Sequence, residues 1–190
     1  MTFADRLSKV GKFFKSGEIV SMEVRVEKPE DVDAVRKVNI AAFGRESEAN
    51  LVDRLRGSVS TLSFVAVESE QIIGHIFFSP VTIAGNCPDD LLVLGLAPLA
   101  VVPERQRQGV GSLLVRHGLN ECAKLGSKAV VVLGHPEYYP RFGFVPAKKK
   151  GFGCEYAVPD EVFMLLELEN GALEGYSGTV KYRPEFKECE

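Results

Sequence analysis

Residues 106–112 read Gln106-Arg107-Gln108-Gly109-Val110-Gly111-Ser112, and this stretch decides which fold the chain is expected to adopt. It joins a nearly continuous apolar run over residues 91–102 to an amphipathic segment that ends near residue 125. Glycines let the backbone approach a ligand closely, and the first N–H groups of a helix carry about half a positive charge. The pattern therefore predicts a buried strand, a turn that can bind an anion, and a helix.

The common nucleotide-binding motifs do not match this turn. No Lys follows Gly111, as G-x-x-x-x-G-K-[ST] requires, and the third glycine of G-x-G-x-x-G is missing. Binding of ATP or of a dinucleotide is therefore not expected. Glycines that serve only to turn the chain are the alternative, but Arg105 and Arg107 beside them favour a phosphate ligand.

Length and composition limit the classes of protein that fit. The chain has 190 residues, of which 45% are hydrophobic and 26% charged, and its formal net charge is −3. These values are typical of one globular domain, and they give no overall positive field to bind nucleic acid. The longest apolar stretch is interrupted by Gly95 and Pro98 and is shorter than the roughly 20 residues of a membrane-spanning helix. We therefore expect neither a nucleic-acid nor a membrane partner.

The cysteines predict no metal or redox site. They are widely separated and form no C-x-x-C pair, and they are Cys87, Cys122, Cys154 and Cys189. We interpret them as reduced thiols of a cytoplasmic protein.

Hydrophobic periodicity and turn residues predict one mixed α/β domain over residues 21–170. The expected strands are 23–27, 62–67, 71–83, 91–102, 129–133 and 161–168, and the expected helices begin at Pro29, Ser47 and the glycine turn, with a short helical turn after Pro136 and a Lys/Gly-rich loop over 147–153. Residues 1–20 are interpreted as an N-terminal extension, helical or frayed, and 171–190 as a loosely attached C-terminal tail. Pro98 cannot donate to a ladder, so a bulge is expected there.

Two segments carry a resemblance to a known family. Residues 99–111, from Leu99-Ala100-Val101 to Gly109-Val110-Gly111, resemble motif A of the GCN5-related N-acetyltransferases (GNAT), whose core is [Gln/Arg]-x-x-Gly-x-[Gly/Ala]. Tyr139-Pro140-Arg141-Phe142-Gly143-Phe144 resembles the family's later Tyr-x-x-x-Gly-Phe signature, and residues 133–144 are similar to the YhbS-type predicted acetyltransferases. The resemblance covers about three quarters of the chain and implies a mixed sheet splayed between its fourth and fifth strands, with acetyl-coenzyme A between them.

The same resemblance implies a set of residues that bind the cosubstrate. Leu99 to Val101 would pair with the pantetheine arm and polarise the thioester carbonyl, and the glycine turn would bind the pyrophosphate. His135 stands where the family often has an Asn beside the pantetheine arm, although an ordinary loop histidine is the alternative. The expected set is Leu99, Ala100, Val101, Gln106, Arg107, Gln108, Gly109, Val110, Gly111, Ser112 and His135.

Tyr139 is the expected general acid, because it has the family's spacing to Gly143-Phe144. A phenol with a pKa near 10 is protonated at neutral pH and can give its proton to the departing thiolate. Tyr138 is the alternate, and a structural role for Tyr139 is the other interpretation. Several family members use a glutamate on strand four as base, but residues 91–102 contain no acid. Deprotonation through water to Glu46 or Glu48 is possible, although both fit solvated helix-start charges.

The expected function is an acyltransferase reaction without metal, in which acetyl-coenzyme A gives its acetyl group directly to a primary amine of a small molecule or a protein. The alternative is a non-catalytic acyl-coenzyme A binding or sensing domain, which would keep the phosphate turn without transfer. His75 and His117 show no ligand spacing and are expected to be structural. The protein is expected to be a monomer or a homodimer.

Overall fold

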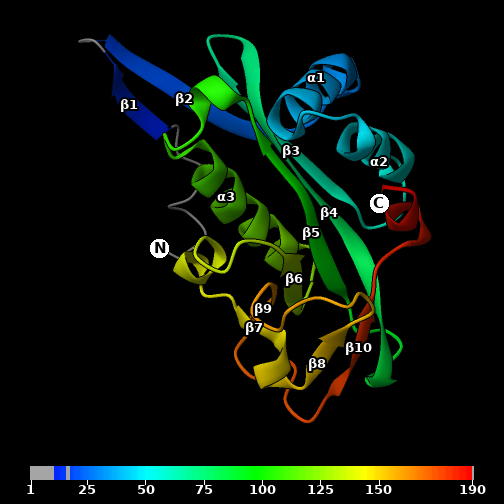
Figure 1. The fold of residues 1–190 in the computed structure, drawn as a ribbon. Helices are drawn as coiled ribbons and strands as arrows, with labels where there is room; N and C mark the ends of the chain where they lie inside the picture. Colours follow the sequence, from blue (N-terminus) through cyan, green and yellow to red (C-terminus); the bar gives the residue numbers. More distant parts are fainter. Residues whose placement is uncertain (1–10, 16–17, 190) are drawn as a thin grey trace.

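The computed structural model describes residues 11–15 and 18–189 (Figure 1). The strands are β1 (Gly11–Lys15), β2 (Glu18–Val26), β3 (Leu62–Glu68), β4 (Gln71–Asn86), β5 (Val93–Val101), β6 (Ala129–Leu133), β7 (Val145–Pro146), β8 (Phe152–Cys154), β9 (Phe163–Glu167) and β10 (Ser177–Lys181). The α-helices are α1 (Val32–Phe43), α2 (Ser47–Leu55) and α3 (Val110–Lys124). Short 3-10 helices are η2 (Pro29–Asp31), η3 (Pro103–Arg105), η4 (Tyr139–Phe142), η5 (Ala147–Lys150) and η6 (Pro184–Cys189).

The main sheet runs in the order β1-β2-β3-β4-β5-β6-β9-β7. Its neighbouring strands are antiparallel, except β5 and β6, which are parallel and are connected along the chain by helix α3. Strand β4 spans 16 residues, so its far end extends beyond β5 and pairs with β10, which also pairs with β8. The mixed α/β fold class that the sequence predicted is confirmed.

Strands β5 and β6 form a fork. Residues 93–95 pair with residues 129–131, and among the described strands no further pairs join β5 to β6. Both strands nevertheless continue, β5 to Val101 and β6 to Leu133. One edge of β5 is therefore left open from Leu96 onward, between the two strands where the family resemblance predicted a splayed sheet.

The bulge expected at Pro98 is present in β5. Ile76 of β4 pairs with Leu99, whereas Phe78 pairs with Leu96, so β5 contains one residue more than β4 over this step. Side chains alternate across a strand, and one extra residue reverses the alternation. Leu96 and Leu99 consequently both pack toward the α3 side of the sheet.

Helix α3 covers one face of the sheet, and α1 with α2 cover the other (Figure 1). Phe77 and Phe78 show the division, because these neighbours on β4 pack into the α1–α2 cluster and the α3 cluster respectively. A third cluster joins the lower part of the sheet to β10 through Val81, Val93 and Tyr182. No helix among the described residues is long and apolar enough to cross a membrane.

The two ends of the chain differ from expectation. Residues 11–15 and 18–20 of the expected extension belong to the β1–β2 hairpin rather than to a helix, the strand expected over 23–27 is the second half of β2, and residues 1–10 lie outside the described part. The loosely attached tail is wrong as a description of residues 177–182, because β10 pairs with β4 and β8 and buries Val180 and Tyr182. The loop expected over 147–153 contains η5 and β8.

Candidate active site

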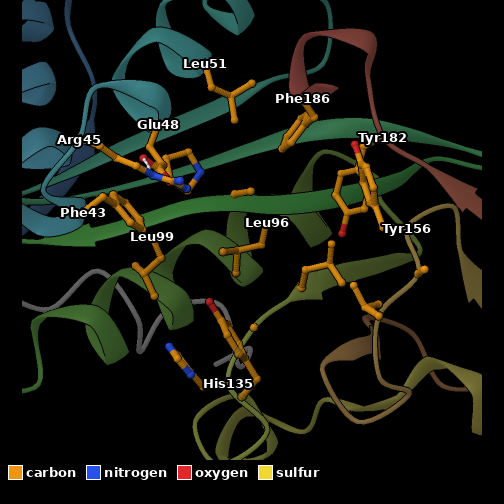
Figure 2. A pocket seen from close by; sticks show the side chains of 17 residues that line it. Phe43, Arg45, Glu48, Leu51, Leu96, Leu99, His135, Tyr156, Tyr182 and Phe186 are labelled. Carbon is orange, nitrogen blue, oxygen red and sulfur yellow. Dashed lines mark hydrogen bonds and ion pairs between the residues drawn. The ribbon is translucent and has the colours of Figure 1, made fainter. Parts of the chain in front are cut away.

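A cleft of about 690 Å³ opens at the fork between β5 and β6 (Figure 2). Its floor is the open edge of β5, and the end of β6 faces it. The lining residues are Phe43, Arg45, Glu48, Leu51, Leu96, Ala97, Pro98, Leu99, Leu133, Gly134, His135, Tyr139, Tyr156, Ala157, Val158, Tyr182 and Phe186. Most of these side chains are apolar or aromatic, which is typical of a site that excludes water around a few polar groups.

The open edge of β5 presents backbone hydrogen-bonding groups to this cleft. The N–H of Val102 donates to the carbonyl of Ile73 at 3.0 Å, so that residue points toward β4. Because backbone groups alternate along an antiparallel strand, the N–H groups of Leu99 and Val101 point the other way, toward β6. β6 does not pair with them, and they are available to an extended ligand.

The predicted anion-binding turn lies between η3 and α3. Arg107 and Gly109 have φ of 60° and 88°, both in the left-handed region, which is typical of turns that present successive backbone N–H groups to an anion. Within the described chain, none of the N–H groups of residues 107–112 is used in a backbone hydrogen bond. Six free donors at a helix N-terminus form a site suited to a phosphate group.

Side-chain amides around the turn bind backbone carbonyls and leave the N–H groups of the turn free. The amide of Gln106 donates to the Val101 carbonyl at 3.0 Å, and that of Gln108 donates to the Glu104 carbonyl at 2.8 Å. Arg105, which the sequence suggested as a phosphate contact, is instead paired with Glu68 at 2.7 Å. Arg107 is exposed at the turn, so its guanidinium can face an anion there.

Tyr139 begins η4 and reaches the cleft from the α3 side of the sheet. It is 7% exposed, and its ring lies edge-on to Phe144 with centroids 5.5 Å apart. Gly134 at the end of β6 makes room for it, because a Cβ there would clash with the Tyr139 ring. Burial, and to a lesser extent Tyr138, raises the pKa of Tyr139, which therefore keeps its proton at neutral pH.

The other predicted residues fall into two groups. His135 lines the cleft, and its carbonyl accepts from the N–H of Tyr138 at 2.9 Å, so it also caps the turn that carries Tyr139. The side chains of Ala100 and Val110 are buried in the protein interior, so only their backbone can meet a ligand. Tyr138 does not line the cleft and packs over the start of α3 instead.

The structure places the two carboxylates considered as proton acceptors in different surroundings. Glu48 lines the cleft, with a side chain only 13% exposed, and Arg45 binds it. Glu46 is 70% exposed, lies 3.9 Å from Arg36, and does not line the cleft. The interpretation of both as solvated charges therefore holds for Glu46 and is wrong for Glu48.

Sequence reasoning missed the aromatic residues at the far end of the cleft, Tyr156, Tyr182 and Phe186. They come from the segment interpreted as a tail and from the loop after β8. Val180 and Tyr182 alternate with Lys181 and Arg183, a period of two that predicts a half-buried strand and could have revealed β10. Among the described residues, no group of His, Cys, Asp and Glu side chains is placed to hold a metal ion.

Comparison with known proteins agrees with this architecture. A family model described as an acetyltransferase (GNAT) domain matches residues 60–146. Over 167 residues, covering 87% of this chain and 98% of the relative, the chain is 38% identical to the uncharacterized N-acetyltransferase YhbS of Escherichia coli strain K12. It is 42% identical over 135 residues to the uncharacterized N-acetyltransferase YjhQ of the same strain, covering 69% of this chain and 74% of that protein.

Two solved structures share the fold at 34% sequence identity. The crystal structure of YhbS from Escherichia coli in complex with coenzyme A gives a TM-score of 0.83 and covers 92% of this chain and 96% of that one. A GNAT family acetyltransferase from Brucella melitensis in complex with acetyl-coenzyme A gives 0.70, covering 87% and 97%. The fold and its forked sheet are thus those of an acyltransferase, the enzyme class that the sequence predicted. The chain belongs to the GNAT family of acetyltransferases.

Proposed function

We propose that this protein transfers the acetyl group of acetyl-coenzyme A to a primary amine, by direct attack of the amine in a ternary complex. The observation that carries the proposal is the fork itself, with a donor-rich turn at the start of α3 and a cleft reaching both faces of β5. The Escherichia coli and Brucella melitensis relatives, solved with coenzyme A and acetyl-coenzyme A, support the same cosubstrate.

The residues around the fork fit the parts of this cosubstrate. The free N–H groups of residues 107–112, with the Arg107 side chain, match a pyrophosphate. The edge groups of Leu99 and Val101 can pair with the amides of the pantetheine arm as a neighbouring strand would. His135 lines the cleft just after the end of β6, so its side chain can contact the arm.

Two groups of the protein serve the acetyl transfer. An N–H group on the open edge of β5 donates to the thioester oxygen as the amine attacks the carbonyl carbon, and one such donor is typically worth about 3–4 kcal/mol of barrier. Tyr139 then gives its proton to the sulfur as the C–S bond breaks and the C–N bond is complete. The proton that the amine nitrogen loses leaves through the open mouth of the cleft to water.

Binding is tested by thermal unfolding with acetyl-coenzyme A. A ligand present at 100 times its dissociation constant stabilises the folded state by about 2.7 kcal/mol, which corresponds to about 5–10 °C for a domain of this size. We expect such a rise in Tm with millimolar acetyl-coenzyme A. Absence of any shift contradicts the proposal.

Transfer is tested by release of the coenzyme A thiol from acetyl-coenzyme A across a panel of primary amines. Amine-dependent release, with the acetylated amine identified by mass spectrometry, is the expected result. A protein that binds acetyl-coenzyme A but releases no thiol with any amine would instead be an acyl-coenzyme A binding domain.

A further inference from the structure

The cleft continues through the fork to the face of β5 that α1, α2 and β10 cover. Tyr139 enters from the α3 side, whereas Glu48 and Tyr182 line the cleft from the opposite side. The glycine turn also lies at the start of α3. An acyl donor held by that turn therefore leaves the opposite side of the fork for the second substrate, so the residues there set which amine is accepted.

Glu48 is the single carboxylate among the described residues that line the cleft. Arg45 binds both of its oxygens, with Nε at 3.1 and 3.2 Å and one terminal nitrogen at 2.6 Å. The pairing fixes the carboxylate while leaving lone pairs for a further donor. Glu48 and Leu99 line the same cleft, so an amine bound by Glu48 shares this cavity with the open edge of β5 (Figure 2).

The other end of the cleft is an aromatic pocket. Tyr182 lies with its ring centroid 5.1 Å from that of Phe186 and 5.9 Å from that of Tyr156. Figure 2 shows these three side chains together, at the opposite end of β5 from Arg45 and Glu48. No lysine lines the cleft among the described residues, and its one arginine is bound to Glu48.

Tyr182 carries the observation that points to a ligand. Its hydroxyl is buried and has no hydrogen-bond partner among the described residues. A buried polar group without a partner costs free energy, so its retention calls for an explanation. The Tyr182 ring packs against Gly95, the last residue of β5 paired with β6. A Cβ at Gly95 would lie 2.9 Å from Cε1 of Tyr182, so the missing side chain makes room for the ring.

We propose that the acceptor is a primary amine on an apolar, aromatic-sized body that ends in a hydrogen-bonding group. Glu48 accepts hydrogen bonds from the amine, the body packs among the aromatic side chains, and the Tyr182 hydroxyl bonds the far polar group. This inference rests on the acetyl transfer proposed above and names the substrate class of the same site.

The charge balance of the cleft favours one amine over several. Arg45 already offsets the charge of Glu48, and the aromatic end offers no further carboxylate. A polyamine or a free amino acid would place a second charged group against apolar surface, without a partner, and that is costly. A molecule with one amine and a neutral body avoids this cost.

The first experiment compares kcat/KM for tyramine, 2-phenylethylamine, spermidine and lysine in the thiol-release assay. We expect kcat/KM for tyramine to exceed the values for spermidine and lysine by at least about tenfold. The value for 2-phenylethylamine should lie between these limits, because it lacks the hydroxyl that would bond the buried Tyr182 oxygen. Preference for spermidine or lysine overturns the acceptor class while leaving acetyl transfer intact. Thiol release with no amine, despite binding of acetyl-coenzyme A, overturns the transfer itself.

The second experiment substitutes Glu48 and uses Glu46 as its matched control. Glu48→Gln keeps the shape and removes the charge, and we expect KM for tyramine to rise about tenfold with KM for acetyl-coenzyme A unchanged. Glu46→Gln, two residues away and outside the cleft, should leave both constants within twofold. Equal effects of the two substitutions contradict the role of Glu48.

The third experiment separates a ligand contact from packing at Tyr182. Tyr182→Phe removes only the unpartnered hydroxyl, so the fold should keep or raise its Tm. We expect KM for tyramine to rise about fivefold or more and KM for 2-phenylethylamine, which lacks the far hydroxyl, to stay unchanged. An unchanged KM for both amines shows that the hydroxyl contacts no acceptor and overturns this part of the proposal.

Discussion

The hydroxyl of Tyr138 occupies the space that a side chain at Gly111 would need, since a Cβ built there lies 2.8 Å from the Tyr138 oxygen. Gly111 has no left-handed φ and lies inside the first turn of α3. Its lack of a side chain therefore serves packing of the loop that carries Tyr139 against the helix that carries the phosphate turn.

This contact predicts that Gly111→Ala changes stability in opposite directions in the native protein and in the Tyr138→Phe variant. Gly111→Ala alone should destabilise the protein, because the Cβ displaces the Tyr138 ring. In Tyr138→Phe the nearest ring atom is 3.8 Å away, an ordinary contact, and the same substitution should stabilise by about 0.5–1 kcal/mol through helix propensity. Urea unfolding of the four proteins measures this, and destabilisation by the same amount in both backgrounds refutes the contact.

Gly109 is needed for a different reason, its φ of 88° at the start of α3. Gly126, just after the other end of the helix, has φ of 91° with nothing near its Cβ position, and it provides a matched control. Alanine at either position should cost about 1–2 kcal/mol of stability. Only Gly109→Ala should weaken acetyl-coenzyme A binding, by at least about tenfold in calorimetry. A comparable loss of affinity in Gly126→Ala points to general destabilisation.

Tyr139→Phe tests the general acid. We expect kcat for thiol release to fall by about 100-fold, the lower range for a positioned proton donor, while the dissociation constant of acetyl-coenzyme A stays the same. Because burial raises the pKa of Tyr139, the native enzyme should show no loss of rate from its ionisation up to about pH 10. Tyr138→Phe is the control, and a larger loss in that variant assigns the proton to the neighbouring residue.

A buried polar chain behind the sheet predicts how stability depends on pH. The Asn39 amide lies 3.1 Å from His75 Nδ1 and donates to the Val35 carbonyl, so Nε2 of His75 carries the proton and faces Ser63 at 2.9 Å. Ser63 in turn donates to Glu27. Burial lowers the pKa of His75, although Glu27 acts in the opposite direction. His75 is thus a structural residue held neutral.

The sign of the pH effect follows from that lowered pKa. As pH falls through about 6.5 the unfolded chain takes up a proton at this position and the folded chain does not, so stability falls by up to about 1.4 kcal/mol per pH unit. Urea unfolding between pH 7.5 and 5 measures the slope. His75→Gln should flatten it, whereas an unchanged slope assigns the effect elsewhere, for example to His117, whose pKa burial also lowers.

The carboxylate of Glu27 adds a second, more acidic transition. Burial alone raises its pKa, but the nearby His75 ring, the hydrogen bond from Ser63 and the charge of Arg56 lower it overall. A carboxyl with a lowered pKa contributes stability above its unfolded value of 4.5 and loses that contribution as pH falls further. No sequence pattern indicated this cluster, because Glu27 follows β2 and its other members come from α1, β3 and β4.

Local patterns were sufficient for most of the fold. The β3–β4 hairpin, helix α3 and strand β6 depend on periodicity, turn residues and capping, which neighbours in the chain supply. Strand β10 was missed because its partners, β4 and β8, are remote in sequence and its own apolar pattern is only two residues long. Tyr182 was missed for the same reason, whereas Glu48 was considered as a proton acceptor but could not be told from Glu46 without the tertiary structure.

The sequence alone determined the strand, turn and helix around Gly109, the bulge at Pro98 and the family, because each depends on residues within a few positions of one another. The tertiary structure decided what surrounds the fork. It bound Arg105 to Glu68, buried Tyr139 against Gly134, and brought Glu48 to the cleft while leaving Glu46 in solvent. Packing across distant segments sets burial and partners, and these determine what each side chain can do.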